Sequence, residues 1–240
     1  MRSRSRFYLQ CAAGFVAALV PVALCAQDPV VTLPKNYQLA FENADVRVVR
    51  VTYGPHEKLA VHDHSKAPVI YVYLSDSGPV RFIHYGAKEN GNIATRQPLK
   101  AGTYRINPGR LEQHAVENAG DIESRFLRVE LKRAELGFKT SDSMAVKHPD
   151  LTQVGLLNEF NSLLFRVDRV LADRKPVQVN GEEPSLLIAY TPALIQLAGA
   201  GAAESLNAGE LRWMEAGHRF DVRSPGTANA HVLRVVFTRR

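Results

Sequence analysis

The sequence predicts an all-β protein that contains two tandem copies of one β unit. Short runs of alternating apolar and polar residues, rich in Val, Ile, Tyr and Phe, recur between Gly, Pro, Asn and Asp. Sustained helical periodicity is almost absent, and several of the runs recur in the second half of the chain. Many short strands with closely spaced turns are typical of a β-sandwich or a β-barrel.

The N-terminal segment 1–26 is typical of a secretory signal peptide. Three arginines lie within the first six residues, an apolar run extends from Cys11 to Leu24, and Ala26 offers a small residue for cleavage. That run is shorter than the about 20 residues of a transmembrane helix, and no later segment is apolar enough to span a bilayer. We therefore expect a periplasmic or secreted protein, cleaved after Ala26. A lipoprotein anchored through Cys25 is the alternative, although Leu24 is larger than the residue such signals place there.

The composition argues against cysteine chemistry and against a nucleic-acid partner. Both cysteines, Cys11 and Cys25, lie in the signal segment, so the cleaved chain has no disulfide, thiolate ligand or cysteine nucleophile. The formal charge of +6 includes three signal arginines and no signal acid, which leaves +3 after cleavage. The remaining basic residues are scattered, so we expect no nucleic-acid partner.

The expected strands follow in order along the first half. They are Val46 to Tyr53, Val69 to Leu74, Val80 to Tyr85, Gly102 to Ile106 and Phe126 to Leu131. The best candidate for a helix is the connector around His148 to Phe160. We expect a first unit over residues 36–135, a connector over 136–157 and a second unit over 158–240.

Short matches at consistent offsets indicate the duplication. The matched pairs are Val49-Arg50-Val51 with Phe165-Arg166-Val167 and Pro68 with Pro184 at an offset of 116, Ala101–Arg105 with Ala208–Arg212 at 107, and Leu127–Val129 with Leu233–Val235 at 106. Each match is short, but their order is conserved along both halves. A repeated unit explains that order better than chance does.

Three histidines form the best candidate site. His62 and His64 lie two apart on an expected strand and therefore on one face, and His114 approaches from another strand. At the repeat offsets these positions become Gln178, Asn180, and Phe220 or Asp221, so the second copy lacks all three histidines. We infer that the histidines serve a site in the first copy and that the second copy is structural or regulatory.

The surrounding residues resemble the two sequence motifs of the cupin family. Gly54 precedes the His62 and His64 pair, Gly102 precedes Pro108, and Asn118 follows His114. The duplicated arrangement is similar to a bicupin over residues 36–240. The resemblance implies two tandem jelly-roll β-barrels with a divalent metal in the mouth of the first. It also implies one of the family's functions, which include dioxygenases, isomerases, decarboxylases, sugar-modifying enzymes and binding proteins.

The chain departs from the cupin pattern at the expected glutamate ligand. That glutamate would fall at Pro68 or Val69, neither of which binds a metal. Three neutral imidazoles leave the charge of a divalent ion uncompensated and favour an anionic substrate group. Loss of the oxygen ligand favours Fe, Zn, Ni, Cu or Mn over Mg or Ca, and the open coordination positions are those that catalytic metals need.

The leading functional hypothesis is a metal-dependent oxidoreductase or isomerase, of dioxygenase or isomerase type, acting on a small anionic or hydroxylated molecule. The alternatives are a non-catalytic small-ligand-binding protein and a structural bicupin, and we include a homodimer among the expectations. Tyr71 and Tyr73 are expected on the same strand face as Val69, which points into the barrel, and are candidate substrate-binding residues. The alternative is that both are core tyrosines whose hydroxyls are satisfied within the protein. Glu112, in the turn before His114, is a candidate carboxylate, with a solvated glutamate as the alternative.

Five other histidines fall outside this hypothesis. We expect structural or surface positions for the group that consists of His56, His84, His148, His218 and His231. No Gly-rich phosphate loop, nucleophile elbow or zinc-protease motif is present in the sequence.

Overall fold

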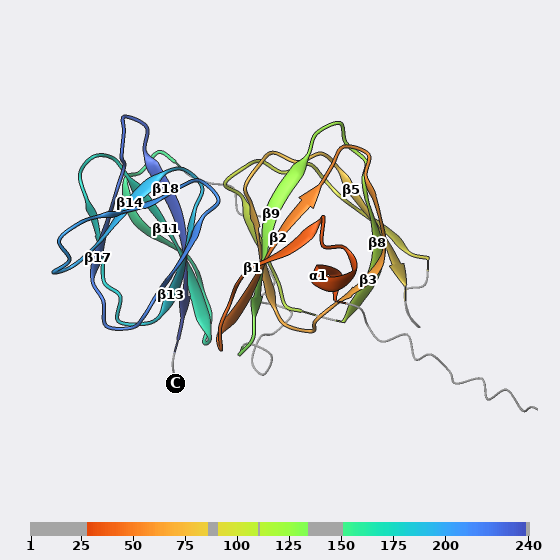
Figure 1. Ribbon diagram of the computed structural model, residues 1–240, viewed down its shortest axis with the longest axis horizontal. Helices are drawn as coiled ribbons and strands as arrows, with labels where there is room; N and C mark the ends of the chain where they lie inside the picture. Colours follow the sequence, from red (N-terminus) through yellow and green to blue (C-terminus); the bar gives the residue numbers. More distant parts are fainter. Residues whose placement is uncertain (1–27, 86–90, 110, 134–150, 239–240) are drawn as a thin grey trace, which may run out of the picture.

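The computed structural model describes residues 28–85, 91–109, 111–133 and 151–238. The expected signal segment and cleavage site, both cysteines and most of the expected connector lie outside these ranges. The described chain consists of strands and their connections with a single helical turn, and it forms two barrels that lie side by side (Figure 1), which confirms the predicted all-β class with two tandem jelly rolls. Within the described ranges, no helix has the length and apolar character needed to cross a membrane.

The first barrel consists of two antiparallel sheets. The five-stranded sheet has the order β1 (Tyr37–Glu42), β2 (Val46–Tyr53), β9 (Ser124–Leu131), β4 (Val69–Tyr73) and β7 (Tyr104–Asn107). The four-stranded sheet has the order β3 (Lys58–His64), β8 (Glu112–Asn118), β5 (Val80–Tyr85) and β6 (Ile93–Arg96). A single helical turn, α1 (Pro29–Thr32), precedes β1.

The second barrel repeats this topology. Its five-stranded sheet has the order β10 (Gly155–Asn161), β11 (Phe165–Ala172), β18 (Ala230–Phe237), β13 (Ser185–Ala189) and β16 (Leu211–Met214). Its four-stranded sheet has the order β12 (Val177–Val179), β17 (Phe220–Arg223), β14 (Ala193–Leu197) and β15 (Glu204–Leu206). Strand for strand, the order matches that of the first barrel.

Two local expectations are wrong. The segment Gly155–Asn161 in the best helical candidate is an edge strand, because it pairs with Arg166 to Leu171 of β11 and this pairing outweighs its local periodicity. The repeat match of the first strand is also displaced. Val48 lies opposite Val129 and Val167 lies opposite Val235, so Val167 corresponds to Val48 and not to Val51. The Val-Arg-Val pattern fits several registers, and only pairing selects one.

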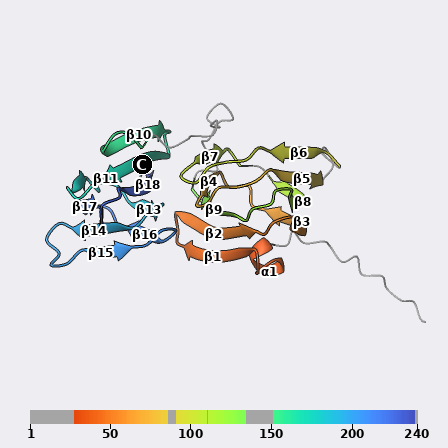
Figure 2. The ribbon, with the colours of Figure 1, turned by 90° about the horizontal axis from the view of Figure 1, so that it is seen from above.

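The two five-stranded sheets face each other where the barrels meet (Figure 2), and the largest buried apolar cluster takes its residues from both of them. Leu127 and Val129 of β9 belong to this shared core, together with Leu233 and Val235 of β18. Phe126 and Arg128, the alternate residues of β9, instead line a cavity inside the first barrel. Each of these strands is therefore buried on both faces, with its apolar face turned toward the other barrel.

Candidate metal centre and ligand pocket

Three buried histidines converge inside the first barrel. His62 and His114 lie opposite each other on the paired strands β3 and β8, and His64 lies two residues farther along β3. Each side chain offers a nitrogen within 4.8 Å of the other two, and the three ring centroids lie 4.8 to 5.0 Å apart. The structure thus brings together the three histidines that the sequence singles out, as a group that could hold a metal ion.

The other motif residues hold the turns around this group. Gly109 has a φ of +84°, and a Cβ there would lie 2.4 Å from the carbonyl oxygen of Lys66, so only glycine fits the turn before β8. The Asn118 amide donates hydrogen bonds to the carbonyls of Gly54 and Ile122 at 2.8 and 2.9 Å. Gly109 and Asn118 therefore act on the turns that position the strands.

Hydrogen bonds fix the orientation of the His62 ring. Its Nδ1 lies 2.9 Å from the carbonyl oxygen of Ala60, and its Nε2 lies 2.9 Å from the hydroxyl of Tyr37. A carbonyl only accepts, so Nδ1 carries the proton and Nε2 accepts from Tyr37. The Tyr37 oxygen lies 2.7 Å from the Tyr53 hydroxyl, which therefore donates to it. The bond from Nδ1 to a backbone carbonyl is the kind that orients metal-binding histidines.

Burial keeps the histidine pair on β3 neutral. Burial lowers the pKa of His62, although the hydrogen bond to Ala60 opposes the shift. Burial, followed by the nearby Arg128 guanidinium, holds the pKa of His64 well below its usual value. Both rings are therefore uncharged at neutral pH and keep a lone pair for a metal.

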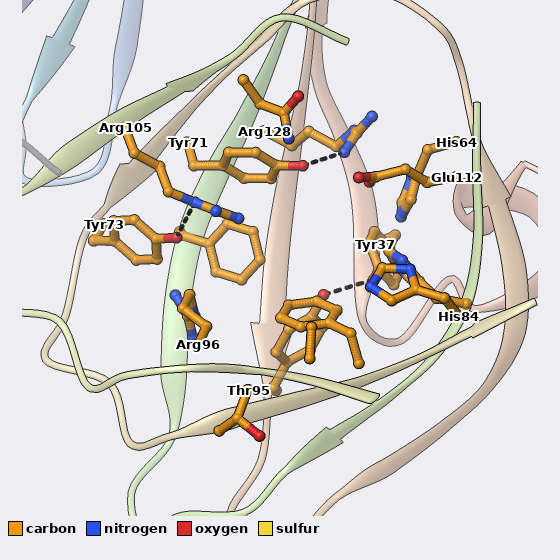
Figure 3. A pocket seen from close by; sticks show the side chains of 16 residues that line it. Tyr37, His64, Tyr71, Tyr73, His84, Thr95, Arg96, Arg105, Glu112 and Arg128 are labelled. Atoms are coloured by element: carbon orange, nitrogen blue, oxygen red, sulfur yellow. Dashed lines mark hydrogen bonds between the residues drawn. The ribbon is translucent and has the colours of Figure 1, made fainter. Parts of the chain in front are cut away.

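A cavity of about 280 Å³ adjoins the histidines (Figure 3). Tyr71, Tyr73 and Glu112 all line it, and both tyrosines lie on the face that the parity argument assigns to them. Glu112 is the first residue of β8 rather than part of the preceding turn, so it shares a face with His114 and lies opposite His64 in the strand register. Whether these three residues bind substrate stays a prediction.

Sequence reasoning missed the arginines of this pocket. Arg96, Arg105 and Arg128 reach it from β6, β7 and β9. Arg128 is buried, donates to Glu130 at 2.9 Å and donates to the Tyr71 hydroxyl at 2.8 Å. For two of them a signal was present, because Arg105 lies between Tyr104 and Ile106 and Arg128 lies between Leu127 and Val129. A charged residue alternating with apolar ones normally marks a solvated strand face.

The second barrel fills the corresponding space with apolar side chains. Val179 lies opposite Phe220 on β12 and β17, as His62 lies opposite His114 on β3 and β8. Both are buried in an apolar cluster. His62 therefore corresponds to Val179, one residue beyond the Gln178 that the repeat offset gave. That offset came from the first-strand match, which the pairing of Val48 and Val167 shows to be displaced. The second copy still lacks the histidines.

The remaining histidines divide into three groups. His56 and His218 are exposed, and His231 is buried at the contact between the barrels, where it touches Arg169. His84 departs from the expectation of a peripheral role. It is buried, it lines the pocket, and its ring centroid lies 5.8 Å from that of His114. His148 lies outside the described residues.

Comparison with known proteins shows the fold. Neither a scan against protein-family models nor a search of curated proteins finds a match. Among solved structures, AerE from Microcystis aeruginosa has a TM-score of 0.57 at 11% identity, over 85% of this chain and 98% of that one. The cupin 2 conserved barrel domain protein from Leptotrichia buccalis has a TM-score of 0.51 at 10% identity, over 84% and 88%.

An enzyme is also among the similar structures. Salicylate 1,2-dioxygenase from Pseudaminobacter salicylatoxidans has a TM-score of 0.53 at 9% identity, over 80% of this chain and 71% of that one. A variant of that enzyme in complex with gentisate has the same TM-score at 10% identity, over 80% and 69%. Likeness at such identities establishes the fold and leaves the activity open. The chain has the fold of the cupin superfamily.

Proposed function

We propose that this chain is a metal-dependent enzyme of the cupin type that acts on a small anionic or hydroxylated organic molecule. The convergence of His62, His64 and His114 carries the proposal, because three imidazoles would hold a divalent transition metal and leave coordination positions open. An ion held there would polarise a substrate oxygen or activate dioxygen. The shared fold with a salicylate dioxygenase supports an oxidoreductase, and isomerisation is the second reaction class we propose.

The chain's own residues supply orientation and protons at the pocket wall. Arg128 donates to the Tyr71 oxygen, and Arg105 donates to the Tyr73 oxygen at 3.1 Å. Arginine has no acceptor, so each tyrosine keeps its hydroxyl proton for a ligand. Burial raises the pKa of Tyr71, so its hydroxyl stays protonated at neutral pH and serves as a hydrogen-bond donor to substrate oxygen.

Pocket dimensions and charge support a small anion as the substrate. The cavity of about 280 Å³ is slightly below the roughly 300–1,000 Å³ of ordinary ligand pockets. Three arginines line it with a single acid, Glu112, and Arg128 is compensated by Glu130. The surplus positive charge would favour an acid over a neutral molecule of equal size.

Metal analysis of protein purified without an affinity tag tests the proposal. We expect about one transition-metal ion per chain and a loss of most of it in His62→Ala. His56→Ala is the matched control, because His56 is exposed and pairs with Asp121. Substoichiometric metal in the native protein that His62→Ala leaves unchanged would refute a metal enzyme, and ligand binding that survives chelation would favour a non-catalytic binding protein.

We also propose that the protein is exported. The basic and apolar pattern of residues 1–26 supports export, with periplasmic or secreted protein as the product. Mass spectrometry of the mature chain tests this, with Gln27 expected as the first residue. A lipid-modified Cys25 would instead establish the lipoprotein, and an intact Met1 in the soluble fraction would exclude both.

A further inference from the structure

Two arginines at one side of the pocket form no ion pair within the part of the chain that the structure describes. Arg96 lies over the ring of Tyr73, with its guanidinium carbon 4.9 Å from the ring centroid, and Arg105 lies 4.4 Å over the ring of Tyr71. Within the described ranges, neither guanidinium has a carboxylate at ion-pair distance. Arg128, in contrast, pairs with Glu130 at 2.9 Å.

The Arg96 guanidinium has unsatisfied donors. Its Nε and one Nη are buried without a hydrogen-bond partner among the described residues. A buried donor without an acceptor is costly, and a charged one more so. Since Arg96 lines the pocket at its edge strand β6, an acceptor bound in the pocket would satisfy those donors.

The arginines and the histidines occupy different sides of the pocket. In Figure 3, Arg96, Arg105 and Tyr73 gather on the left, whereas His64, His84 and Glu112 gather on the right. Aromatic rings form the wall between them. Phe126 lies 5.6 Å from Tyr73 and 6.1 Å from Tyr71, and Phe82 lies 5.3 Å from His114. The pocket thus has a cationic end, an aromatic middle and a histidine end.

We infer that Arg96 and Arg105 form a carboxylate subsite, so that the substrate is a planar acid with its carboxylate directed away from the histidines. The opposite end of that molecule carries the oxygen atoms that face the histidine group. Guanidinium groups bind carboxylates through paired donors, and the free Nε and Nη of Arg96 present such a pair. This inference rests on the proposed function, because it takes the histidine group as the other end of the site.

Binding of two matched probes tests the inference. The acid probe is 3,4-dihydroxybenzoate, which has a chelating catechol end and a carboxylate at the other, and the neutral probe is 3,4-dihydroxybenzamide. Calorimetric titration of the full chain, with zinc and after chelation, gives both affinities. In the zinc-loaded protein we expect the acid to bind about 10- to 100-fold more tightly than the amide, as a charge-assisted bond to a buried donor implies.

Substitutions of the two arginines test whether they cause the preference for the acid over the amide. We expect Arg96→Gln and Arg105→Gln each to weaken the acid more than the amide and so to reduce the acid-to-amide ratio about 10-fold. Arg96→Lys retains the charge and should keep part of the preference. Arg125→Gln is the matched control, because Arg125 lies on β9 but is exposed and pairs with Glu123. Far-UV circular dichroism confirms that each variant is folded.

The outcomes separate this inference from the proposed function. Equal affinities of acid and amide, no binding of either, or a preference that survives both glutamine variants would overturn the carboxylate subsite. If zinc tightens both probes equally without an acid preference, the metal centre stands and the subsite falls. If the acid preference persists and depends on Arg96 while zinc has no effect on either probe, the subsite stands and the metal centre falls.

Discussion

Truncation of Leu127 should destabilise both barrels together. Leu127 is fully buried in the apolar core shared by the two five-stranded sheets. A leucine-to-alanine change in such a core leaves a cavity that neighbouring strands cannot close, and costs about 3 to 5 kcal/mol. For a chain of this size that loss lowers the midpoint of thermal unfolding by about 6 to 20 °C.

The single tryptophan provides a reporter in the other barrel. Trp213 lies on β16 of the second barrel and stacks on Phe41 of the first, with ring centroids 6.0 Å apart. We expect Leu127→Ala to lower the midpoints from tryptophan fluorescence and far-UV circular dichroism by the same amount, in one transition. Leu39→Ala, at an exposed leucine of β1, is the control and should change stability by less than about 0.5 kcal/mol. Two transitions, with the fluorescence midpoint unchanged, would refute the shared core.

Three further predictions concern the histidines. Replacing His62 by Val and His114 by Phe, the residue types of the second barrel, should leave a folded protein that metal no longer stabilises. Metal at 100 times its dissociation constant should stabilise the native protein by about 2.7 kcal/mol, which raises its midpoint of thermal unfolding by about 5 to 11 °C. An equal rise in the midpoint of the double variant would contradict the metal site. Tyr37→Phe should tighten metal binding about 2- to 10-fold in a competition titration, because metal at His62 Nε2 must otherwise displace the Tyr37 hydroxyl; weaker binding would instead show that Tyr37 helps to hold the metal. Burial, assisted by Arg169, lowers the pKa of His231 to about 3. The unfolded chain then binds more protons between about pH 6.5 and pH 3, so stability falls on acidification by up to about 1.4 kcal/mol per pH unit. Urea unfolding should show a shallower fall for His231→Gln, and an unchanged slope would refute this assignment.

The paired barrels give the histidine group an internal comparison. Both barrels have the same strand order. In the second barrel, Val179 and Phe220 fill the space that corresponds to His62 and His114 of the first barrel. The histidines are therefore unnecessary for the fold, which supports a functional reason for their presence. The filled second barrel and the shared apolar core favour a supporting role for that half of the chain.

Patterns along the chain were enough to predict the strands, the duplication and the three histidines. Alternation of apolar residues predicted the cores of β2, β4, β5, β7 and β9 to within two residues at each end. The spacing of His62 and His64 placed them on one face of a strand, because side chains in a strand repeat every two residues. These are local properties, so they can be read along the chain.

Which face of each strand encloses the pocket depends on the packing of the two barrels and could not be predicted from the chain. The apolar residues of β9, Leu127 and Val129, face the second barrel, and Arg128 faces the cavity. A single barrel in water would need the opposite arrangement, with its apolar face inside. The second barrel covers the outer face and so permits a polar interior. That contact joins residues more than a hundred positions apart, and no local pattern encodes it.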